Sequence, residues 1–359
     1  NYFPLFLNKG KGQYVYDLDG NKYLDYISAL GSVSVGYGNN YINKRVIDNL
    51  KNGNCFSLSH PKEISVADKL IKLIPSAEMV RFGKNGTDVN SAAIRLARHV
   101  TKKNVIAVCG YHGWQDWYIT STPMNSGIPN EVKKFTKKFQ FNDIESLSKI
   151  LSKNKCAAVI MEPLSYQLPK KKFLLQVRAL CNKYNTLLIF DEVCTGFRVS
   201  LGGAQKHYKV VPDISTFGKA MANGFPLAAI VGKKKIMSQM KDIFYSGTFA
   251  GETSSLNACE ATIDFLKNNN SIFKNIKKGN FLRKKLNDII NQNNLENILS
   301  LTGHETWLFL NVKKIKNINP DIVKAYIRQE LIKNKVLFLG SFNITHSHTY
   351  KDLLHTIEI

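Results

Sequence analysis

The middle of the chain alternates between short apolar runs and longer segments in which apolar residues recur every three or four positions. The apolar runs predict five strands, at Met79–Phe82, Asn104–Val108, Ala157–Met161, Leu187–Phe190 and Leu227–Val231. The helical pattern recurs near residues 87–101, 143–153, 172–184 and 253–267. Strands that alternate with helices in this way are typical of crossover units in a mostly parallel sheet. The pattern therefore predicts an α/β fold.

Both ends of the chain have a different character. After about residue 265 a long polar helix is predicted near 271–293, then short strands near 306–311, a helix near 319–334 and a final strand at Val336–Leu339. Near the start, alternating residues on either side of Asp19-Gly20 predict a hairpin. We expect a large domain over residues 53–265 and a smaller α+β domain made of both termini, 1–52 and 266–359.

The overall composition is that of an ordinary globular protein. Hydrophobic residues make up 44% of the chain and charged residues 21%. No apolar stretch approaches the roughly 18 residues that span a membrane, and no secretory signal is visible. We therefore expect a cytoplasmic protein without a membrane partner.

The formal net charge of +23 favours attraction to anions, including nucleic acid. The lysines are dispersed, however, and they are not interleaved with aromatic residues in a recognisable nucleic-acid module. A basic nucleic-acid-binding protein is thus a remote alternative, and no nucleic-acid partner is expected.

Cysteine and histidine spacing does not indicate a metal or disulfide framework. The six cysteines form no C-x-x-C pair, and most lie in apolar runs, so buried free thiols are expected. His346 and His348 are two residues apart, but no third ligand is in view. We predict no metal site.

A carboxylate and a lysine provide the strongest chemical signal. The apolar run Leu187–Phe190 ends in Asp191, and a buried parallel strand delivers such an acid to the sheet edge where α/β proteins bind ligands. Lys219 lies among small and apolar residues, where burial makes a lysine more nucleophilic. An enzyme that uses pyridoxal phosphate (PLP) requires this pair: the lysine forms a Schiff base, and the acid keeps the pyridine nitrogen protonated.

Other strand ends could add to such a site. Gly86 and Thr87 open a helix, where free N–H groups favour an anion, although an ordinary capped helix has the same pattern. Tyr111 follows the next strand and could stack on a planar cofactor or simply fill the core. Glu162 closes another strand.

A phosphate-binding loop of the nucleotidase type is the main rival. Two adjacent acids after an apolar strand also occur in those enzymes, which additionally carry G-x-x-x-x-G-K-[ST]. In this chain Gly218-Lys219 is followed by Ala220, and Gly83-Lys84 is followed by Asn85. Because neither segment fits, the sequence weighs against nucleotide hydrolysis.

In combination these segments resemble the class III (subgroup II) PLP-dependent aminotransferases of fold type I, and within them the glutamate-1-semialdehyde 2,1-aminomutases. The resemblance runs from about Gln13 to the C-terminus. The motifs that carry it are Tyr16-Asp17-Leu18-Asp19-Gly20, Asn85-Gly86-Thr87-Asp88, Tyr111-His112-Gly113, Asp191-Glu192-Val193, Thr195-Gly196-Phe197-Arg198, Phe217-Gly218-Lys219 and Gly247-Thr248-Phe249.

The resemblance implies two catalytic residues. Lys219 would form the Schiff base with pyridoxal 5'-phosphate and later move the substrate proton, and Asp191 would pair with the pyridinium nitrogen. The other cofactor-binding residues that it implies are Gly86 and Thr87 at the phosphate, Tyr111 and Val193 on the two ring faces, His112, Glu162 beside Asp191, and Thr248 from a neighbouring subunit.

The resemblance also implies a homodimer with shared active sites. The reaction would move an amino group between a small amino compound and a carbonyl compound. An aminomutase of the same family, which returns the amine to a neighbouring carbon of the same molecule, is the alternative. The stretches Trp114–Tyr118 and Gly251–Thr253 look more like aminotransferase-type relatives, so we favour the transferase.

Overall fold

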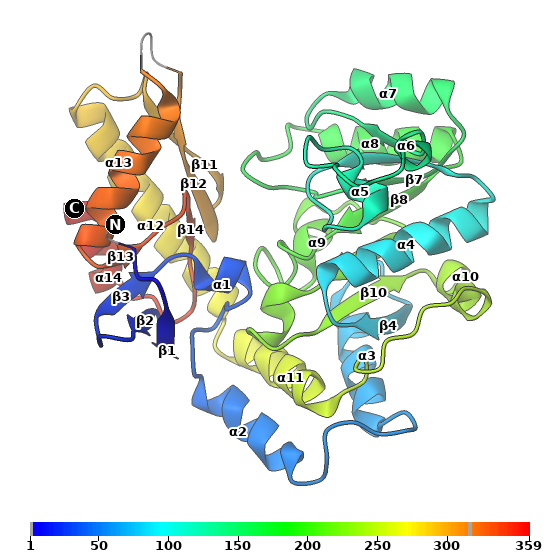
Figure 1. Cartoon of the computed structure of the whole chain (residues 1–359), viewed down its shortest axis with the longest axis horizontal. Helices are drawn as coiled ribbons and strands as arrows, with labels where there is room; N and C mark the ends of the chain where they lie inside the picture. The colour runs from blue at the N-terminus through cyan, green and yellow to red at the C-terminus, as the bar shows by residue number, and fades with distance from the viewer. Residues whose placement is uncertain (1–2, 315–317) are drawn as a thin grey trace. The chain divides into compact units, whose positions relative to one another are not determined.

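The structure, a computed structural model, describes residues 3–314 and 318–359 (Figure 1). Contacts divide the chain into two compact units. The large unit comprises Arg45–Ser165 and Pro169–Ile263, and the small unit comprises Asn1–Lys44, Tyr166–Leu168 and Asp264–Ile359.

A seven-stranded sheet forms the centre of the large unit, in the order β4-β10-β9-β8-β7-β5-β6. Its strands are β4 (Met79–Gly83), β5 (Val105–Cys109), β6 (Thr136–Lys138), β7 (Cys156–Met161), β8 (Leu187–Asp191), β9 (Ile214–Phe217) and β10 (Ala228–Gly232). Strands β9, β8, β7, β5 and β6 pair in parallel, whereas β10 runs antiparallel to both β9 and β4. The predicted α/β fold with a mostly parallel sheet is confirmed.

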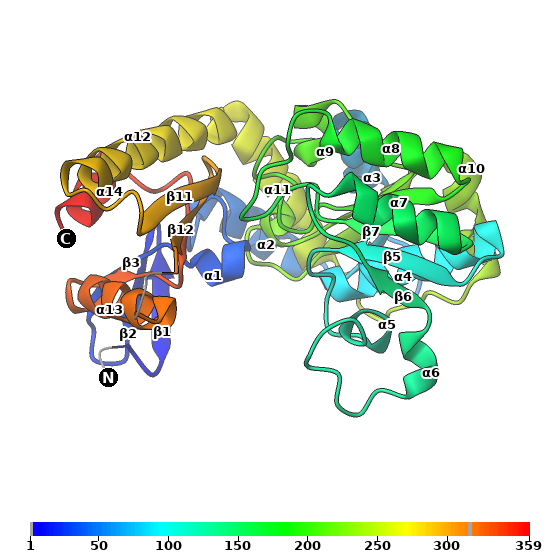
Figure 2. The same cartoon turned by 90° about the horizontal axis from the view of Figure 1, so that it is seen from above.

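Helices cover both faces of this sheet (Figure 2). Successive residues of β5 show why, since Ile106 and Val108 pack with α4 (Gly86–Thr101), whereas Ala107 and Cys109 pack on the side of α7 (Ile144–Lys153) and α8 (Phe173–Lys183). Side chains alternate along a strand, so a strand covered on both faces is apolar at nearly every position. This is why the central strands stand out in the sequence.

Shorter elements complete the large unit. They are α3 (Pro61–Leu73), α5 (Asp116–Ile119), α6 (Asn130–Lys133), α9 (Gly203–Tyr208), α10 (Lys234–Met237) and the 3₁₀ segments η1 (Lys219–Ala222) and η2 (Ser238–Asp242). The boundaries between the two units fall within α2 (Asn40–Leu50) and α11 (Thr253–Asn268).

The small unit contains two sheets. The first consists of β1 (Leu7–Lys11), β2 (Tyr14–Asp17), β3 (Lys22–Asp25) and β13 (Val336–Leu337), and the second of β11 (Leu299–His304), β12 (Trp307–Val312) and β14 (Ser341–Asn343). Its helices are α1 (Ser28–Gly31), α12 (Ser271–Gln292), α13 (Pro320–Lys333) and α14 (Tyr350–Glu358). β13 pairs in parallel with β3, so the C-terminal part of the chain extends the N-terminal hairpin.

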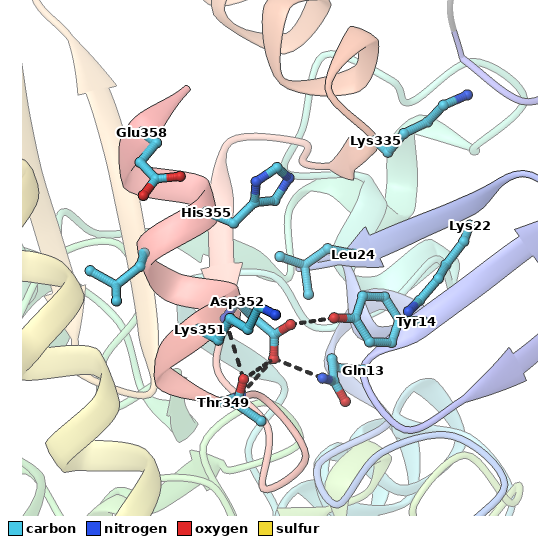
Figure 3. Close-up of a pocket in the computed structure, with 11 residues that line it drawn as sticks. Gln13, Tyr14, Lys22, Leu24, Lys335, Thr349, Lys351, Asp352, His355 and Glu358 are labelled. Atoms are coloured by element: carbon cyan, nitrogen blue, oxygen red, sulfur yellow. Dashed lines mark hydrogen bonds between the residues drawn. The ribbon is translucent and has the colours of Figure 1, made fainter.

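One carboxylate joins the two ends of the chain within the small unit (Figure 3). Asp352 on α14 accepts hydrogen bonds from the Gln13 amide at 2.7 Å and from the Tyr14 hydroxyl. A cavity of about 630 Å³ lies beside this junction. Two of its cationic groups have partners, since the Lys22 ammonium lies 3.6 Å from the Tyr14 ring centroid and Lys335 donates to Asn21. None of the residues predicted for catalysis lines it.

The sequence prediction missed the strands β1, β6, β9, β11 and β14, the C-terminal helix α14, and the short helices α1, α5, α6, α9 and α10. β9 is the most important, because its sequence, Ile-Ser-Thr-Phe, is short and half polar, and it forms a strand by pairing with β8 and β10. Among the described residues, no helix combines the length and apolarity needed to cross a bilayer.

Candidate active site

Six strands of the large unit (β4, β5, β6, β7, β8 and β9) end at one edge of its sheet, and predicted site residues follow five of them. β5, β7, β8 and β9 are parallel, and β4 runs in the same direction because both β4 and β9 are antiparallel to β10. The predicted site residues that follow these strands are Gly86 and Thr87 after β4, Tyr111 and His112 after β5, Glu162 after β7, Asp191 at the end of β8, and Lys219 after β9. The topology thus gathers residues that are far apart in sequence.

The Asp191 carboxylate is buried and held from several sides. Its Oδ2 accepts a hydrogen bond from the Asn90 amide at 2.8 Å and lies 2.8 Å from His112 Nδ1. Its Oδ1 accepts from the Val193 backbone N–H at 3.1 Å. Side-chain exposure is 3% for Asp191 and zero for His112. A carboxylate with this many donors is fixed in place and stays hydrogen-bonded away from water.

Asn90 is a site residue that the sequence analysis missed. Its amide nitrogen donates to Asp191 and, at 3.2 Å, to the His112 carbonyl, while its amide oxygen accepts from the Thr216 hydroxyl at 2.6 Å. It therefore links α4 to the ends of β5, β8 and β9. The available signal was a polar residue between the buried Val89 and Ala92 on the apolar face of a helix.

Aromatic rings support the His112 side of the site. Trp117 lies nearly parallel to the His112 ring at 6.4 Å between centroids, and Tyr118 meets His112 edge to face at 5.2 Å. The Tyr118 hydroxyl donates to the Gly110 carbonyl at 2.6 Å. Tyr111 itself is 61% exposed, so its ring is accessible to a ligand.

Glu162 lies close to this network. Its Oε2 accepts from the Tyr111 backbone N–H at 3.0 Å. Gly110 has φ +110°, and a Cβ there would lie 2.6 Å from Glu162 Oε2, so the carboxyl packs directly against the backbone. Burial, and secondly the negative charge of Asp191, raise the pKa of Glu162 to about 7.

Glu192, the acid that follows Asp191 in the sequence, has a different environment from Asp191. It is fully buried, and it accepts hydrogen bonds from the Thr195 hydroxyl and from the backbone N–H groups of Ala204 at 2.7 Å and Gln205 at 2.8 Å. Burial raises the pKa of Glu192 despite these donors. Glu192 therefore holds the start of α9, while Asp191 faces the site.

Lys219 follows β9 in a constrained backbone conformation. Its φ is +45°, in the left-handed region, which costs a residue with a Cβ roughly 1 kcal/mol or more. Such strain is concentrated at functional sites, where the surrounding structure enforces it. The Lys219 Nζ lies 2.8 Å from the sulfur of Cys194.

The cysteines only partly follow the sequence prediction. Cys109, Cys156, Cys181 and Cys259 are buried thiols that form no disulfide, as predicted. The prediction is wrong for Cys55, which is exposed, and for Cys194, which is half-buried. The loop after β8 carries Cys194 to the site edge instead of into the core.

The start of α4 is suited to an anion such as phosphate. The Thr87 hydroxyl is buried there and has no hydrogen-bond partner among the described residues. A Cβ at Gly86 would lie 2.8 Å from a Val193 methyl group, so only a glycine lets the helix start pack against Val193. Backbone N–H groups of a first helical turn add donors and a favourable dipole.

Thr248 lies elsewhere in the large unit. It is on the exposed segment between η2 and α11 and borders a groove of about 600 Å³ that also includes Phe82 and Glu252. Among the described residues, no hydrogen bond or ring contact joins Thr248 to the hydrogen-bonded group of Asp191, Asn90, His112 and Thr216 (the Asp191 cluster).

Replacing Asn90 with alanine should show how much its hydrogen bonds in the Asp191 cluster stabilise the folded protein. The buried Thr216 hydroxyl and Asp191 would each lose a partner, so we expect the free energy of unfolding to fall by about 1–3 kcal/mol. Chemical denaturation of Asn90→Ala measures this. Asn280→Ala, at an exposed position of α12, is the control and should change little. Equal losses in both variants would contradict the assignment.

Glu162 should make stability depend on pH. Its folded pKa is raised above the ordinary 4.5 to about 7, so the folded state binds its proton more tightly than the unfolded chain. The unfolding free energy should therefore fall as pH rises from about 5 to 7, by on the order of 2 kcal/mol. Glu162→Gln should lose this slope, whereas Glu145→Gln, at an exposed position, should keep it. Parallel curves for Glu162→Gln and the unmodified chain would refute the shift.

Comparison with known proteins places this arrangement in a family. Residues 1–348 match the family model described as aminotransferase class-III. The chain is 37% identical to 3-aminobutyryl-CoA aminotransferase of Cloacimonas acidaminovorans (99% of this chain, 88% of the relative) and 38% identical to glutamate-1-semialdehyde 2,1-aminomutase of Wigglesworthia glossinidia brevipalpis (99% and 89%).

A solved structure gives the same result. The FumI protein of Sphingopyxis sp. MTA144, in its PLP internal aldimine form, superposes with a TM-score of 0.92 at 26% identity, over 99% of this chain and 87% of that one. The resemblance inferred from the motifs is thus confirmed. The chain belongs to the class-III aminotransferase family, and it is a pyridoxal 5'-phosphate-dependent transaminase or aminomutase.

Proposed function

We propose that Lys219 and Asp191 are the catalytic pair of this enzyme. The observation that carries the proposal is the position of Asp191: a buried carboxylate at the end of β8, held by Asn90, His112 and the Val193 N–H. Asp191 pairs with Thr216 of β9, three residues before Lys219, so the two groups leave adjacent strands at the same edge.

The residues at this edge fit the cofactor. Gly86 and Thr87 would hold its phosphate, which would give the buried Thr87 hydroxyl the acceptor that it lacks among the described residues. Val193 and the exposed Tyr111 ring would cover the two faces of the pyridine ring. The bound cofactor supplies an electron-poor ring that stabilises negative charge on the substrate carbon.

The chain's own groups then have distinct tasks. Asp191 keeps a proton on the pyridine nitrogen, and Asn90 and His112 keep the Asp191 carboxylate oriented. The Lys219 amine would hold the cofactor through its aldehyde carbon. Once a substrate amine had displaced it, the Lys219 amine would be free to accept the proton from the substrate's Cα.

We favour transfer of an amino group between two separate molecules. The two curated relatives compared above have different activities, one an aminotransferase and one an aminomutase, at nearly equal identity. The segments Trp114–Tyr118 and Gly251–Thr253 support the two-substrate reaction. The aminomutase reaction is the alternative, and the same Lys219 and Asp191 chemistry would serve both.

The functional unit that we propose is a homodimer in the cytoplasm. Thr248 is exposed and lies on a segment with the exposed Phe244 and Phe249. Its place away from the Asp191 cluster is consistent with a threonine that serves the partner's phosphate site rather than its own. In that arrangement each active site is completed by the other subunit.

Absorbance tests the role of Lys219. The purified enzyme with pyridoxal 5'-phosphate should show a band near the visible–ultraviolet boundary from the lysine-bound cofactor. Lys219→Ala should abolish this band and reduce turnover to background, because no amine remains at that position. Lys206→Ala, at an exposed position of α9, should keep both. A band that survives in Lys219→Ala would refute the proposal.

A single amino donor distinguishes the two reactions. Without a carbonyl acceptor, a transferase should convert its cofactor to the amine form once and then stop. Adding an acceptor should restore turnover. Spectra and product analysis follow both stages. Sustained turnover of one compound with no acceptor would instead support an aminomutase acting on that compound.

A further inference from the structure

The contact between Lys219 and Cys194 is not used by the proposed reaction. The Lys219 Nζ donates a hydrogen bond to the Cys194 sulfur, with 2.8 Å between the two atoms. The two residues come from different loops, one after β8 and one after β9. A nucleophilic amine and an oxidisable sulfur thus meet directly at the site.

We propose that Cys194 and Lys219 form an oxidative modification site in which peroxide joins them through a sulfur–nitrogen bond. The thiol first attacks hydrogen peroxide: the sulfur gains one oxygen as a sulfenic acid, the O–O bond breaks, and water leaves. The Lys219 ammonium then releases one proton to solvent, and the resulting amine attacks that sulfur. The S–N bond forms, the S–O bond breaks, and a second water carries away the hydroxyl and one amine proton.

Both partners are held where this reaction needs them. The Cys194 carbonyl accepts from the buried Arg198 guanidinium at 3.1 Å, which fixes the loop after β8. Lys219 begins η1, whose next residues, Ala220 and Met221, are fully buried. Little backbone movement is therefore needed to close the bond, and thiol reagents should reopen it.

Solvent exposure and the nearby Lys219 charge favour oxidation of Cys194 over oxidation of the buried thiols. Cys109, Cys156 and Cys181 are buried, and burial raises the pKa of each thiol to between about 11 and 12. Burial also raises the pKa of Cys194, but the Lys219 charge opposes it, and the side chain is half-buried. Cys55 is exposed, so it reports general oxidation without a cross-link.

The S–N bond should prevent Lys219 from bonding to the cofactor, because its single amine cannot bond to the Cys194 sulfur and to the cofactor's aldehyde carbon at the same time. This consequence rests on the proposed role of Lys219. Oxidation should therefore act on the enzyme only while the Lys219 amine is free, as it is when the cofactor is in its amine form. Peroxide would then trap the enzyme reversibly between two halves of its reaction.

Mass spectrometry of the full-length enzyme tests the proposal. One sample is loaded with pyridoxal 5'-phosphate and another with pyridoxamine 5'-phosphate, and both are treated with hydrogen peroxide and denatured. The pyridoxamine sample should lose the mass of two hydrogen atoms and yield a peptide pair joined at Cys194 and Lys219. Dithiothreitol should restore the original mass, and the pyridoxal sample should resist.

Matched variants make the outcome specific. Cys55→Ser should keep the cross-link, whereas Cys194→Ala and Lys219→Ala should each lose it. Lys219→Ala should instead gain one oxygen at Cys194, which shows that the thiol is reachable even when the partner is missing.

The possible failures are distinguishable. Absence of a joined peptide in the pyridoxamine sample, with Cys194 unmodified or carrying only added oxygens, would overturn the modification site, whatever the absorbance result for Lys219→Ala. An equally abundant cross-link in both samples would support the modification site but contradict the proposed role of Lys219 as the cofactor-bound amine.

Discussion

A carboxylate sealed from solvent at the end of β8 is the constraint on which the rest of the site depends. An uncompensated charge in such a place is costly, so Asp191 needs donors from every element around it. Asn90 comes from α4, His112 from the loop after β5, and the Val193 N–H from its own loop. Asn90 is itself held by Thr216 on β9. One buried charge thereby couples four elements of the large unit.

The backbone at the same edge of the sheet is tightly packed and, at Lys219, conformationally constrained. Gly86 packs against Val193, and Gly113 against Thr87, at distances that leave no room for a side chain. Lys219 adopts a left-handed conformation at the end of β9. These close approaches and this conformation fix the positions of Thr87, Val193 and Lys219, as a preorganised site requires.

Asp191, the last residue of β8, and Glu192, which follows it, point to opposite sides, as successive residues along a strand do. Asp191 points toward α4 and meets Asn90, whereas Glu192 points to the other side and holds the backbone N–H groups of Ala204 and Gln205. From the sequence, Asp191-Glu192 also resembled the acid pair of a phosphate-binding-loop nucleotidase, an interpretation that the missing loop motif weighed against. Their environments, which depend on the packed helices, give them unrelated tasks.

Strong apolar periodicity made most of the fold predictable. β5, β7 and β8 are buried on both faces, and their long apolar runs stand out against the helices between them. β9 did not stand out, because Ser215 and Thr216 interrupt it, and their polar groups are satisfied by Ser76, Gln205 and Asn90 from elsewhere in the chain. The strand propensity of a short segment contains no information about hydrogen-bond partners that come from distant parts of the chain.

The sequence by itself determined the family and its cofactor, because the motifs around Lys219, Asp191, Gly86-Thr87 and Tyr111-His112 stand in a fixed order with distinctive neighbours. Tertiary structure decided which side chains serve them. Asn90 and Cys194 reach Asp191 and Lys219 from other elements, so no spacing rule along the chain reveals them. Those contacts arise from parallel strands ending at one edge, a long-range arrangement that exists only once the sheet has formed.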